Sequence, residues 1–325
     1  MLLIAGFKKD LKDFVKKELQ PFSKSVKELS ESKFLIDSEI TEVLANTFLL
    51  ENLSVVVAEF KDVKEIKADF SKFIKSDESF KVKCAEKQIC VELGQLIKDS
   101  TNCEVSLDNP DKTFNVEKFL DKYYSCLIIP GAADLIKRGY AANNNEFLTA
   151  DVAKAMIDLS GYKDDGLLID PFCHEGYTII ECALKLLNVG PAYFNSKNFD
   201  FKFIEPKVKP LKNKLICCSD SMADIKFSKQ NAKTSKTFKF IDFGFSTLND
   251  IDYTFKEAKF DYFVTALPKN ADVEKLFFQL DYIMKKECVI VILTSQDIAG
   301  KFEEYGFKIK EEMPIINKKL FKMVR

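Results

Sequence analysis

Short apolar runs alternate with amphipathic stretches over the first 75 residues of the chain. An apolar run of strand type lies at residues 2–5, and a helical stripe spaces its apolar residues from position 9 to 19, where Pro21 stops it. Further strands are expected at residues 34–36 and 54–60, and further helices at residues 40–48 and 62–75. This order predicts an α+β unit of ferredoxin-like type over residues 1–75.

The next part of the chain repeats this alternation on a smaller scale. A strand is expected at residues 80–84 and a helix at residues 88–97. Turn residues at 108–111 and at 130–131 punctuate three further strands, at residues 104–107, 113–120 and 123–129. We therefore expect a second small α+β domain over residues 76–134, followed by a linker at residues 135–146.

From residue 147 the pattern changes to strands separated by helices. A helix is expected at residues 147–159, and a closing hairpin at residues 307–311 and 319–323. The strands between them are expected at residues 166–169, 215–218, 238–241, 262–265 and 289–294. Helices between successive strands favour a doubly wound parallel sheet, so residues 147–325 are predicted to form a Rossmann-like domain.

The stretch at residues 167–177 carries the strongest functional signal in this domain. It reads Leu-Leu-Ile-Asp-Pro-Phe-Cys-His-Glu-Gly-Tyr, an apolar strand that breaks into a short loop before the helical pattern that starts at Thr178. Ligands of doubly wound folds bind at the carboxyl ends of such strands. The loop keeps one glycine, Gly176, and carries His174, the single histidine of the chain, where a second glycine would be usual.

Composition and charge exclude several classes of protein. The 325 residues are 46% hydrophobic and 30% charged, which is typical of a globular protein. Nine cysteines without paired C-x-x-C motifs indicate neither a disulfide framework nor a zinc site, and we expect no metal. The apolar start of the chain is too short to span a bilayer, so a cytoplasmic location without a membrane partner is expected.

Nucleic-acid binding is not indicated by net charge. Residues 1–140 carry 22 basic and 24 acidic side chains, and residues 141–325 carry 27 and 26. The cations are 47 lysines and two arginines, Arg138 and Arg325, so few bidentate guanidinium contacts to phosphate are available. Any role in RNA binding therefore rests on other observations.

Several segments, in their order along the chain, resemble the THUMP-domain RNA methyltransferases of archaea, which modify the exocyclic amine of guanine in tRNA. Asp-Pro-Phe-Cys at residues 170–173 is similar to the cofactor loop of that family, and Glu181 matches a glutamate that follows it. The other similar segments lie at residues 79–83, 109–111, 135–140 and 260–265. The resemblance implies a class I methyltransferase domain at residues 147–325, preceded by a ferredoxin-like domain and a THUMP domain at residues 76–134.

The same resemblance implies a cofactor, a partner and their sites. S-adenosylmethionine would be the methyl donor, and RNA, expected to be tRNA, would be the partner. Asp170 would lie beside the methionine end of the cofactor, and Asp220 would bind its ribose hydroxyls. The expected cofactor-binding set is Asp170, Pro171, Cys173, His174, Gly176 and Asp220. Lys137 and Arg138 in the linker are the candidates for contacts with the RNA backbone.

Two motifs depart from the family pattern. The cofactor loop reads His174, Glu175, Gly176, Tyr177 where the family has Gly-Ser-Gly-Thr. The catalytic positions hold Ala266, Leu267, Pro268 and Lys269 in place of Asn or Asp, Pro, Pro and an aromatic residue. The family uses the polar side chain and a proline carbonyl to hold the target amine, and the aromatic ring to stack on the flipped base. Ala266 offers no such acceptor.

Three functional hypotheses follow. The first is an RNA-binding, methyltransferase-like protein with weak or lost catalysis, acting as a partner for another subunit. The second is an active tRNA guanine-amine methyltransferase with divergent motifs. The third is a Rossmann-like protein that binds a different small molecule or a protein partner and has no role with RNA.

Overall fold

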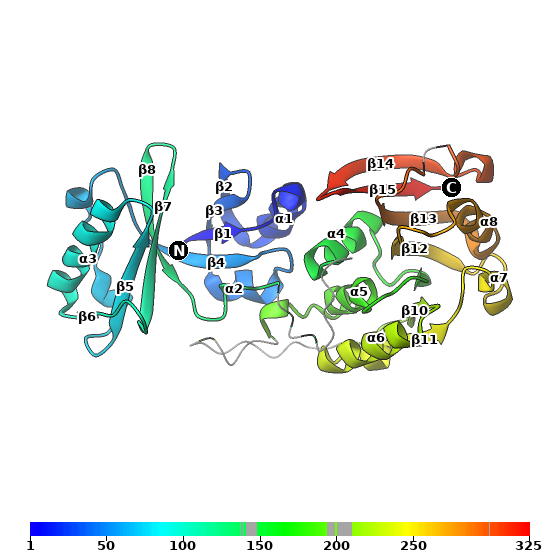
Figure 1. Ribbon diagram of the computed structural model, residues 1–325, viewed down its shortest axis with the longest axis horizontal. Helices are drawn as coiled ribbons and strands as arrows, with labels where there is room; N and C mark the ends of the chain where they lie inside the picture. The colour runs from blue at the N-terminus through cyan, green and yellow to red at the C-terminus, as the bar shows by residue number, and fades with distance from the viewer. Residues whose placement is uncertain (137, 139, 141–147, 194–198, 200–209, 299) are drawn as a thin grey trace. The chain divides into compact units, whose positions relative to one another are not determined.

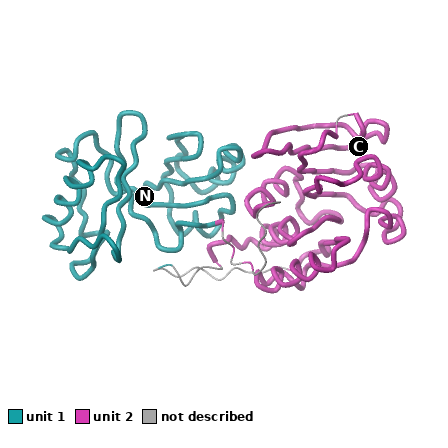
Figure 2. Tube along the Cα trace, in the orientation of Figure 1, with its two compact units in different colours: residues 1–135, 195–202 teal, residues 136–194, 203–325 magenta. Residues whose placement is uncertain are grey.

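The computed structural model describes residues 1–136, 138, 140, 148–193, 199, 210–298 and 300–325. The chain divides into two compact units (Figure 2). The first comprises residues 1–135 with residues 195–202, and the second comprises residues 136–194 and 203–325. Each unit has its own β-sheet.

The first unit is built on one sheet of eight strands, in the order β2-β3-β1-β4-β8-β7-β5-β6. Its strands are β1 (Leu2–Gly6), β2 (Ser23–Ser30), β3 (Lys33–Ser38), β4 (Asn52–Phe60), β5 (Ser79–Cys84), β6 (Glu104–Val105), β7 (Lys112–Phe119) and β8 (Lys122–Ile128). Its helices are α1 (Lys12–Leu19), α2 (Ile40–Asn46) and α3 (Lys87–Thr101). The antiparallel pairing of β4 with β8 joins the strands of residues 1–75 to those of residues 76–134.

Aromatic residues fill the core beneath β5, β7 and α3. Phe80 and Phe114 are fully buried, and the ring of Phe114 meets both Phe80 and Phe70 edge to face. Phe60 of β4 belongs to the same cluster, so this core reaches β4 at the middle of the sheet. The assignment of residues 76–134 as a THUMP domain stays a prediction.

One helix predicted in this unit is wrong. Residues 62–75 form two 3₁₀ turns, at Val63–Glu65 and Phe70–Lys72. The carboxylates of Asp62 and Asp69 accept hydrogen bonds from the backbone N–H two residues onward, and such local bonds compete with a continuous helix. Of the apolar residues whose spacing predicted the helix, Val63, Phe70 and Ile74 are buried and Ile66 is half-buried. Their spacing therefore indicated burial and not helical structure.

The second unit is a doubly wound domain with a seven-stranded sheet, in the order β11-β10-β9-β12-β13-β15-β14. Its strands are β9 (Leu168–Asp170), β10 (Leu215–Ser219), β11 (Ile241–Phe245), β12 (Phe260–Ala266), β13 (Met284–Thr294), β14 (Lys308–Ile315) and β15 (Lys318–Val324). Its helices are α4 (Ala150–Ser160), α5 (Tyr177–Leu187), α6 (Met222–Thr234), α7 (Ile251–Thr254) and α8 (Val273–Ile283). Figure 1 shows α4, α5 and α6 along one face of the sheet and α7 and α8 along the other.

The topology confirms the predicted Rossmann-like fold. Strands β9 to β13 are parallel, and β15 and β14 close the sheet as the antiparallel hairpin expected from the sequence. The chain runs outward from β9 to β11 on one side and from β12 onward on the other, so the strand order reverses between β9 and β12. Doubly wound folds bind their ligands beside this reversal, at the carboxyl ends of the strands.

The strand predicted at residues 238–241 is displaced along the chain. Phe238–Phe240 forms a 3₁₀ turn, and the strand itself is Ile241–Phe245. The shift follows from pairing, because Leu215 at the start of β10 lies opposite Ile241. Asp242 and Phe243 therefore belong to β11 rather than to the loop that follows it.

Candidate active site

The carboxyl ends of β9, β10 and β12 meet beside the reversal of strand order. Asp170 ends β9, Asp220 follows β10, and Ala266 ends β12. The sheet register places these strands next to one another, with β9 in the middle. The structure therefore brings together three sites that the sequence predicted separately.

Asp170 is buried at the centre of this edge, with 1% of its surface exposed. Its Oδ1 accepts hydrogen bonds from the Thr265 hydroxyl at 2.6 Å and from the Phe172 backbone N–H at 3.1 Å. Burial raises the pKa of Asp170 to about 7, although these two hydrogen bonds act in the opposite direction. The carboxyl consequently changes its protonation near neutral pH.

The loop after β9 keeps the backbone of a glycine-rich turn. His174 has φ 44° and Gly176 has φ 83°, both in the left-handed region that glycine favours. A Cβ on Gly176 would lie 3.0 Å from Cβ of Ser228 and 3.2 Å from its Cα, so α6 packs directly on the loop. His174 therefore adopts a backbone conformation that glycine favours, but it carries an imidazole where glycine has only a hydrogen atom.

The imidazole of His174 spans the space between the loop and the end of β12. Its Nδ1 lies 3.9 Å from Oδ2 of Asp224 on α6, and the ring lies close to the backbone of Ala266 at the end of β12. Burial lowers the pKa of His174 below its ordinary value, against the opposing effects of Asp224 and the Ala266 backbone. A ring therefore lies where glycine would leave room for a ligand.

The other unusual residues of the loop face the protein interior. Tyr177 is buried and stacks on Tyr140, with ring centroids 5.2 Å apart. Glu175 is 8% exposed, and burial raises its pKa. Pro171 and Cys173 are also buried, and Sγ of Cys173 lies 3.4 Å from the Ser228 hydroxyl. Of the three bulky replacements, Glu175 and Tyr177 are buried and His174 is half-buried.

Asp220 is the exposed carboxylate of the site. It lies directly after β10, and Ser221 then caps α6 by accepting a hydrogen bond from the Asp224 backbone N–H at 3.2 Å. The cap leaves Asp220 in the turn between strand and helix, which is the position from which acids bind ribose hydroxyls in such folds.

The four catalytic-motif positions have separate surroundings. Ala266 and Leu267 are buried, with 1% and 2% exposure, and Leu267 belongs to the hydrophobic core. Pro268 is half-buried and Lys269 is exposed. The backbone N–H of Leu267 donates to the carbonyl of Leu293 on β13 at 2.8 Å, which fixes the chain as it leaves the sheet.

The backbone carbonyl of Pro268 accepts two hydrogen bonds within the protein. Gln296 donates from Nε2 to the Pro268 oxygen at 2.8 Å, and the Ala271 backbone N–H donates to the same oxygen at 3.1 Å. The sequence does not predict Gln296 as part of the site, because nothing in its local sequence sets it apart. Its role follows from its position just past the end of β13.

The expected contact of Arg138 with RNA needs correction. The Arg138 side chain is fully buried, with Nε 3.0 Å from Oε1 and Nη2 3.3 Å from Oε2 of Glu181 on α5. The Tyr140 hydroxyl donates to the same Oε1 at 2.9 Å. Arg138 therefore anchors the start of the second unit to α5, and no face of its guanidinium reaches solvent. Lys137 lies outside the described residues.

The part of the chain that the structure describes contains neither a metal site nor a membrane span. No group of three or more His, Cys, Asp and Glu side chains is arranged to hold a metal ion among these residues. No helix within the described ranges is long and apolar enough to cross a membrane.

The family that matches part of this chain and two of its archaeal relatives are methyltransferases. Residues 138–299 match the UPF0020 family, described as an RMKL-like methyltransferase domain. The tRNA (guanine(6)-N2)-methyltransferase of Methanocaldococcus jannaschii is 24% identical over 94% of both chains. The enzyme of the same name from Archaeoglobus fulgidus is 28% identical over 59% of this chain and 54% of its own length.

Among solved structures, TrmN from Thermus thermophilus superposes with a TM-score of 0.76 over 100% of this chain and 99% of its own, at 13% identity. That likeness concerns the fold. The sequence matches show that the chain belongs to the UPF0020 family through its RMKL-like methyltransferase domain at residues 138–299, and that it is similar along nearly its whole length to an archaeal tRNA guanine-N2-methyltransferase.

Proposed function

We propose that this protein binds tRNA in the cytoplasm as a methyltransferase-like protein, with weak or absent transfer of a methyl group to the guanine amine. The observation that carries this proposal is the end of β12. Ala266 has no polar side chain, its backbone lies beside the His174 ring, and the Pro268 carbonyl accepts hydrogen bonds from Gln296 and from the Ala271 backbone. Transfer requires the amine to be held in line with the methyl carbon, and the side chain of Ala266 offers no acceptor for the amine.

The family implies S-adenosylmethionine as the cofactor, and its two ends fit this site differently. Asp220 is exposed at the end of β10 and suits the ribose hydroxyls. At the reacting end the loop carries the His174 ring where the family has glycine, and this ring lies beside the Ala266 backbone. When bound, the cofactor supplies an electrophilic methyl group. The contribution of this chain is to bind the ribose, while it lacks the groups that would orient an acceptor.

The decisive experiment follows cofactor binding and methyl transfer separately. Calorimetric titration with S-adenosylmethionine is run on the wild type, His174→Gly and Asp220→Asn, and incorporation of labelled methyl groups into transcribed tRNA is measured in parallel. We expect His174→Gly to bind the cofactor about tenfold more tightly than the wild type, because the loop regains open space at an unchanged φ. Asp220→Asn should weaken binding, since the amide is a poorer acceptor for hydroxyls than the carboxylate.

The wild type should bind tRNA with an affinity that falls steeply with salt, and should incorporate no methyl group above a no-enzyme control. The double variant Ala266→Asn/Lys269→Phe serves as a matched partial reconstruction of the motif. Multiple-turnover methylation of tRNA by the wild type would overturn the proposal in favour of an active enzyme with divergent motifs. Salt-independent or undetectable tRNA binding would favour a protein that has no role with RNA.

A further inference from the structure

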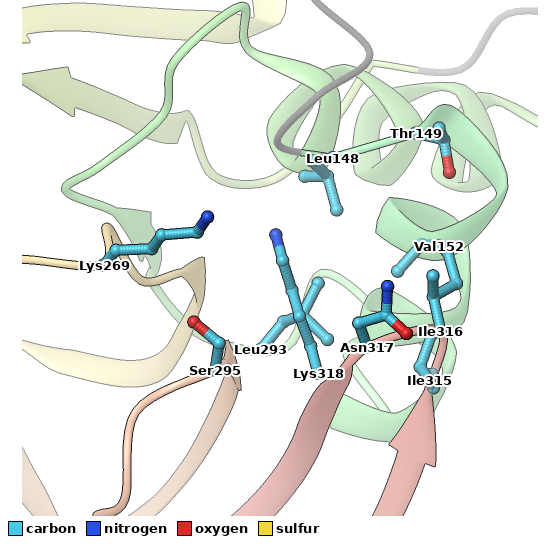
Figure 3. A pocket seen from close by; sticks show the side chains of 10 residues that line it. All are labelled: Leu148, Thr149, Val152, Lys269, Leu293, Ser295, Ile315, Ile316, Asn317 and Lys318. Atoms are coloured by element: carbon cyan, nitrogen blue, oxygen red, sulfur yellow. The ribbon is translucent and has the colours of Figure 1, made fainter.

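A basic and aromatic surface lies at the edge of the doubly wound sheet that is away from the catalytic-motif positions. It is formed by α6, by the edge strand β11 and by the 3₁₀ turn at Phe238–Phe240 between them (Figure 1). The pocket of about 320 Å³ in which the side chains of Lys269 and Lys318 converge is separate from it (Figure 3). That pocket lies on the other side of β9, beside the catalytic-motif positions, and belongs to the candidate active site.

Lysine is concentrated on this α6–β11 surface. Residues 222–239 carry five lysines and one aspartate, whereas the whole chain has a net charge of −1. The five lysines are all exposed, namely Lys226, Lys229, Lys233, Lys236 and Lys239. The first three are three and four residues apart, so they form one stripe along α6. The near-neutral charge of the whole chain conceals this local excess of cations.

Two phenylalanine rings lie next to the lysine stripe. The rings of Phe238 and Phe243 are stacked, with centroids 5.5 Å apart and an angle of 22° between their planes. Nζ of Lys233 lies 5.4 Å from the centroid of Phe238, and Nζ of Lys229 lies 5.9 Å from that of Phe243. Phe238 is 40% exposed. An exposed ring among ammonium groups is the combination that proteins use to bind unpaired nucleotides, because it offers both stacking and charge.

The carboxylates of this region do not neutralise the stripe. Asp242 follows Ile241 on β11, and its side chain points away from that of Phe243, because successive side chains of a strand lie on opposite faces. It lies 3.8 Å from Nζ of Lys214. Within the described ranges, no carboxylate forms an ion pair with Lys229 or Lys233. The surface therefore keeps an uncompensated positive charge beside its rings.

We propose that the α6–β11 surface binds a single-stranded segment of RNA, with phosphates along the lysine stripe and a base on the exposed ring of Phe238. Lysine binds phosphate as a point charge, and aromatic rings stack on unpaired bases of any sequence. A duplex keeps its bases paired and stacked on one another, so it contacts only the lysines. The inference goes beyond the proposed function, because this second RNA surface requires neither the cofactor site nor the fold of tRNA.

Fluorescence anisotropy with the full chain tests the charge of the surface. The probes are a labelled oligouridylate of about ten nucleotides, an RNA duplex of the same length and a polyglutamate peptide. We expect the single strand to bind about tenfold more tightly than the duplex or the peptide. Lys229→Gln/Lys233→Gln should lower the slope of log affinity against log salt by about 1.4, because each phosphate contact of a single strand contributes about 0.7. The control Lys308→Gln/Lys310→Gln, two exposed lysines of β14, should leave the slope unchanged.

The contribution of stacking is tested with Phe238→Leu, which keeps an apolar side chain and removes the ring. We expect affinity for the single strand to fall about fivefold or more at an unchanged salt slope, since stacking involves no counterion release. Phe278→Leu is the matched control, because Phe278 on α8 is also exposed, at 59%. It should change affinity by less than about twofold.

Equal binding of the duplex would overturn the proposal in favour of a general surface for polyanions. Tighter binding of the peptide would overturn it in favour of an acidic protein partner. The proposal also fails if either α6–β11 variant matches its control. Binding of tRNA and methyl transfer are measured separately, so failure of the proposed function there leaves this result unchanged.

Discussion

The carboxyl of Asp170 is buried between Thr265 and the backbone of the loop, and it holds its proton up to about pH 7. In the unfolded chain an aspartate titrates near pH 3.9. Between about pH 4 and pH 7 the folded protein therefore retains a proton that the unfolded chain has released. It follows that stability falls as the pH rises through this window.

We predict that Asp170→Asn removes this pH dependence. The amide oxygen of asparagine can accept the hydrogen bonds from Thr265 and Phe172 without carrying a charge. The free energy of unfolding of the second unit should rise by about 2 kcal/mol at pH 8 and lose its slope between pH 4 and 7. Urea unfolding at several pH values measures both, with the exposed Asp220→Asn as the control. An unchanged slope in Asp170→Asn would assign the pH dependence to another group.

At the scale of elements, the ion pair of Arg138 and Glu181 connects the start of the second unit to α5. Both side chains are fully buried, so removing one charge leaves the other without compensation. We predict that Glu181→Gln destabilises the second unit by about 3 kcal/mol. The double variant Arg138→Met/Glu181→Met should recover more than half of that loss, since it removes both charges.

A double-mutant cycle in urea unfolding measures this coupling. The ion pair Lys301–Glu274 is the control, because it is exposed and its rupture by Glu274→Gln should cost less than about 1 kcal/mol. Equal losses for Glu181→Gln and Glu274→Gln would show that the buried pair contributes no more than a surface contact.

The elements also show where apolar periodicity predicts structure and where it does not. Strands with a buried face, such as β4 and β12, were expected within two residues of their observed bounds. Strand β2 was missed because it lies at the edge of its sheet and has no fully buried residue, so its sequence carries no apolar alternation. The 3₁₀ turns at residues 62–75 were predicted as a helix because their buried positions have helical spacing.

At the scale of the whole molecule, the two units have separate hydrophobic cores. We predict two unfolding transitions in calorimetry. Phe114→Ala should lower the free energy of unfolding of the first unit by about 3–5 kcal/mol, and Phe277→Ala should lower that of the second unit by a similar amount. Each ring is fully buried in the core of a different unit. A single transition that both variants shift equally would show that the units unfold together.

The sequence by itself determined the order of the strands and helices of the doubly wound unit, the family resemblance, and the acids at the ends of β9 and β10. These features depend on residues close together in the chain, whose spacing records burial and chain direction. The contacts that decide function at the site join distant residues: Gln296 reaches Pro268 across 28 positions, and Arg138 reaches Glu181 across 43. The placement of the His174 ring beside Ala266 and the convergence of Lys269 and Lys318 likewise exist only once the sheet has formed. Tertiary structure decided them because partners so far apart leave no local pattern.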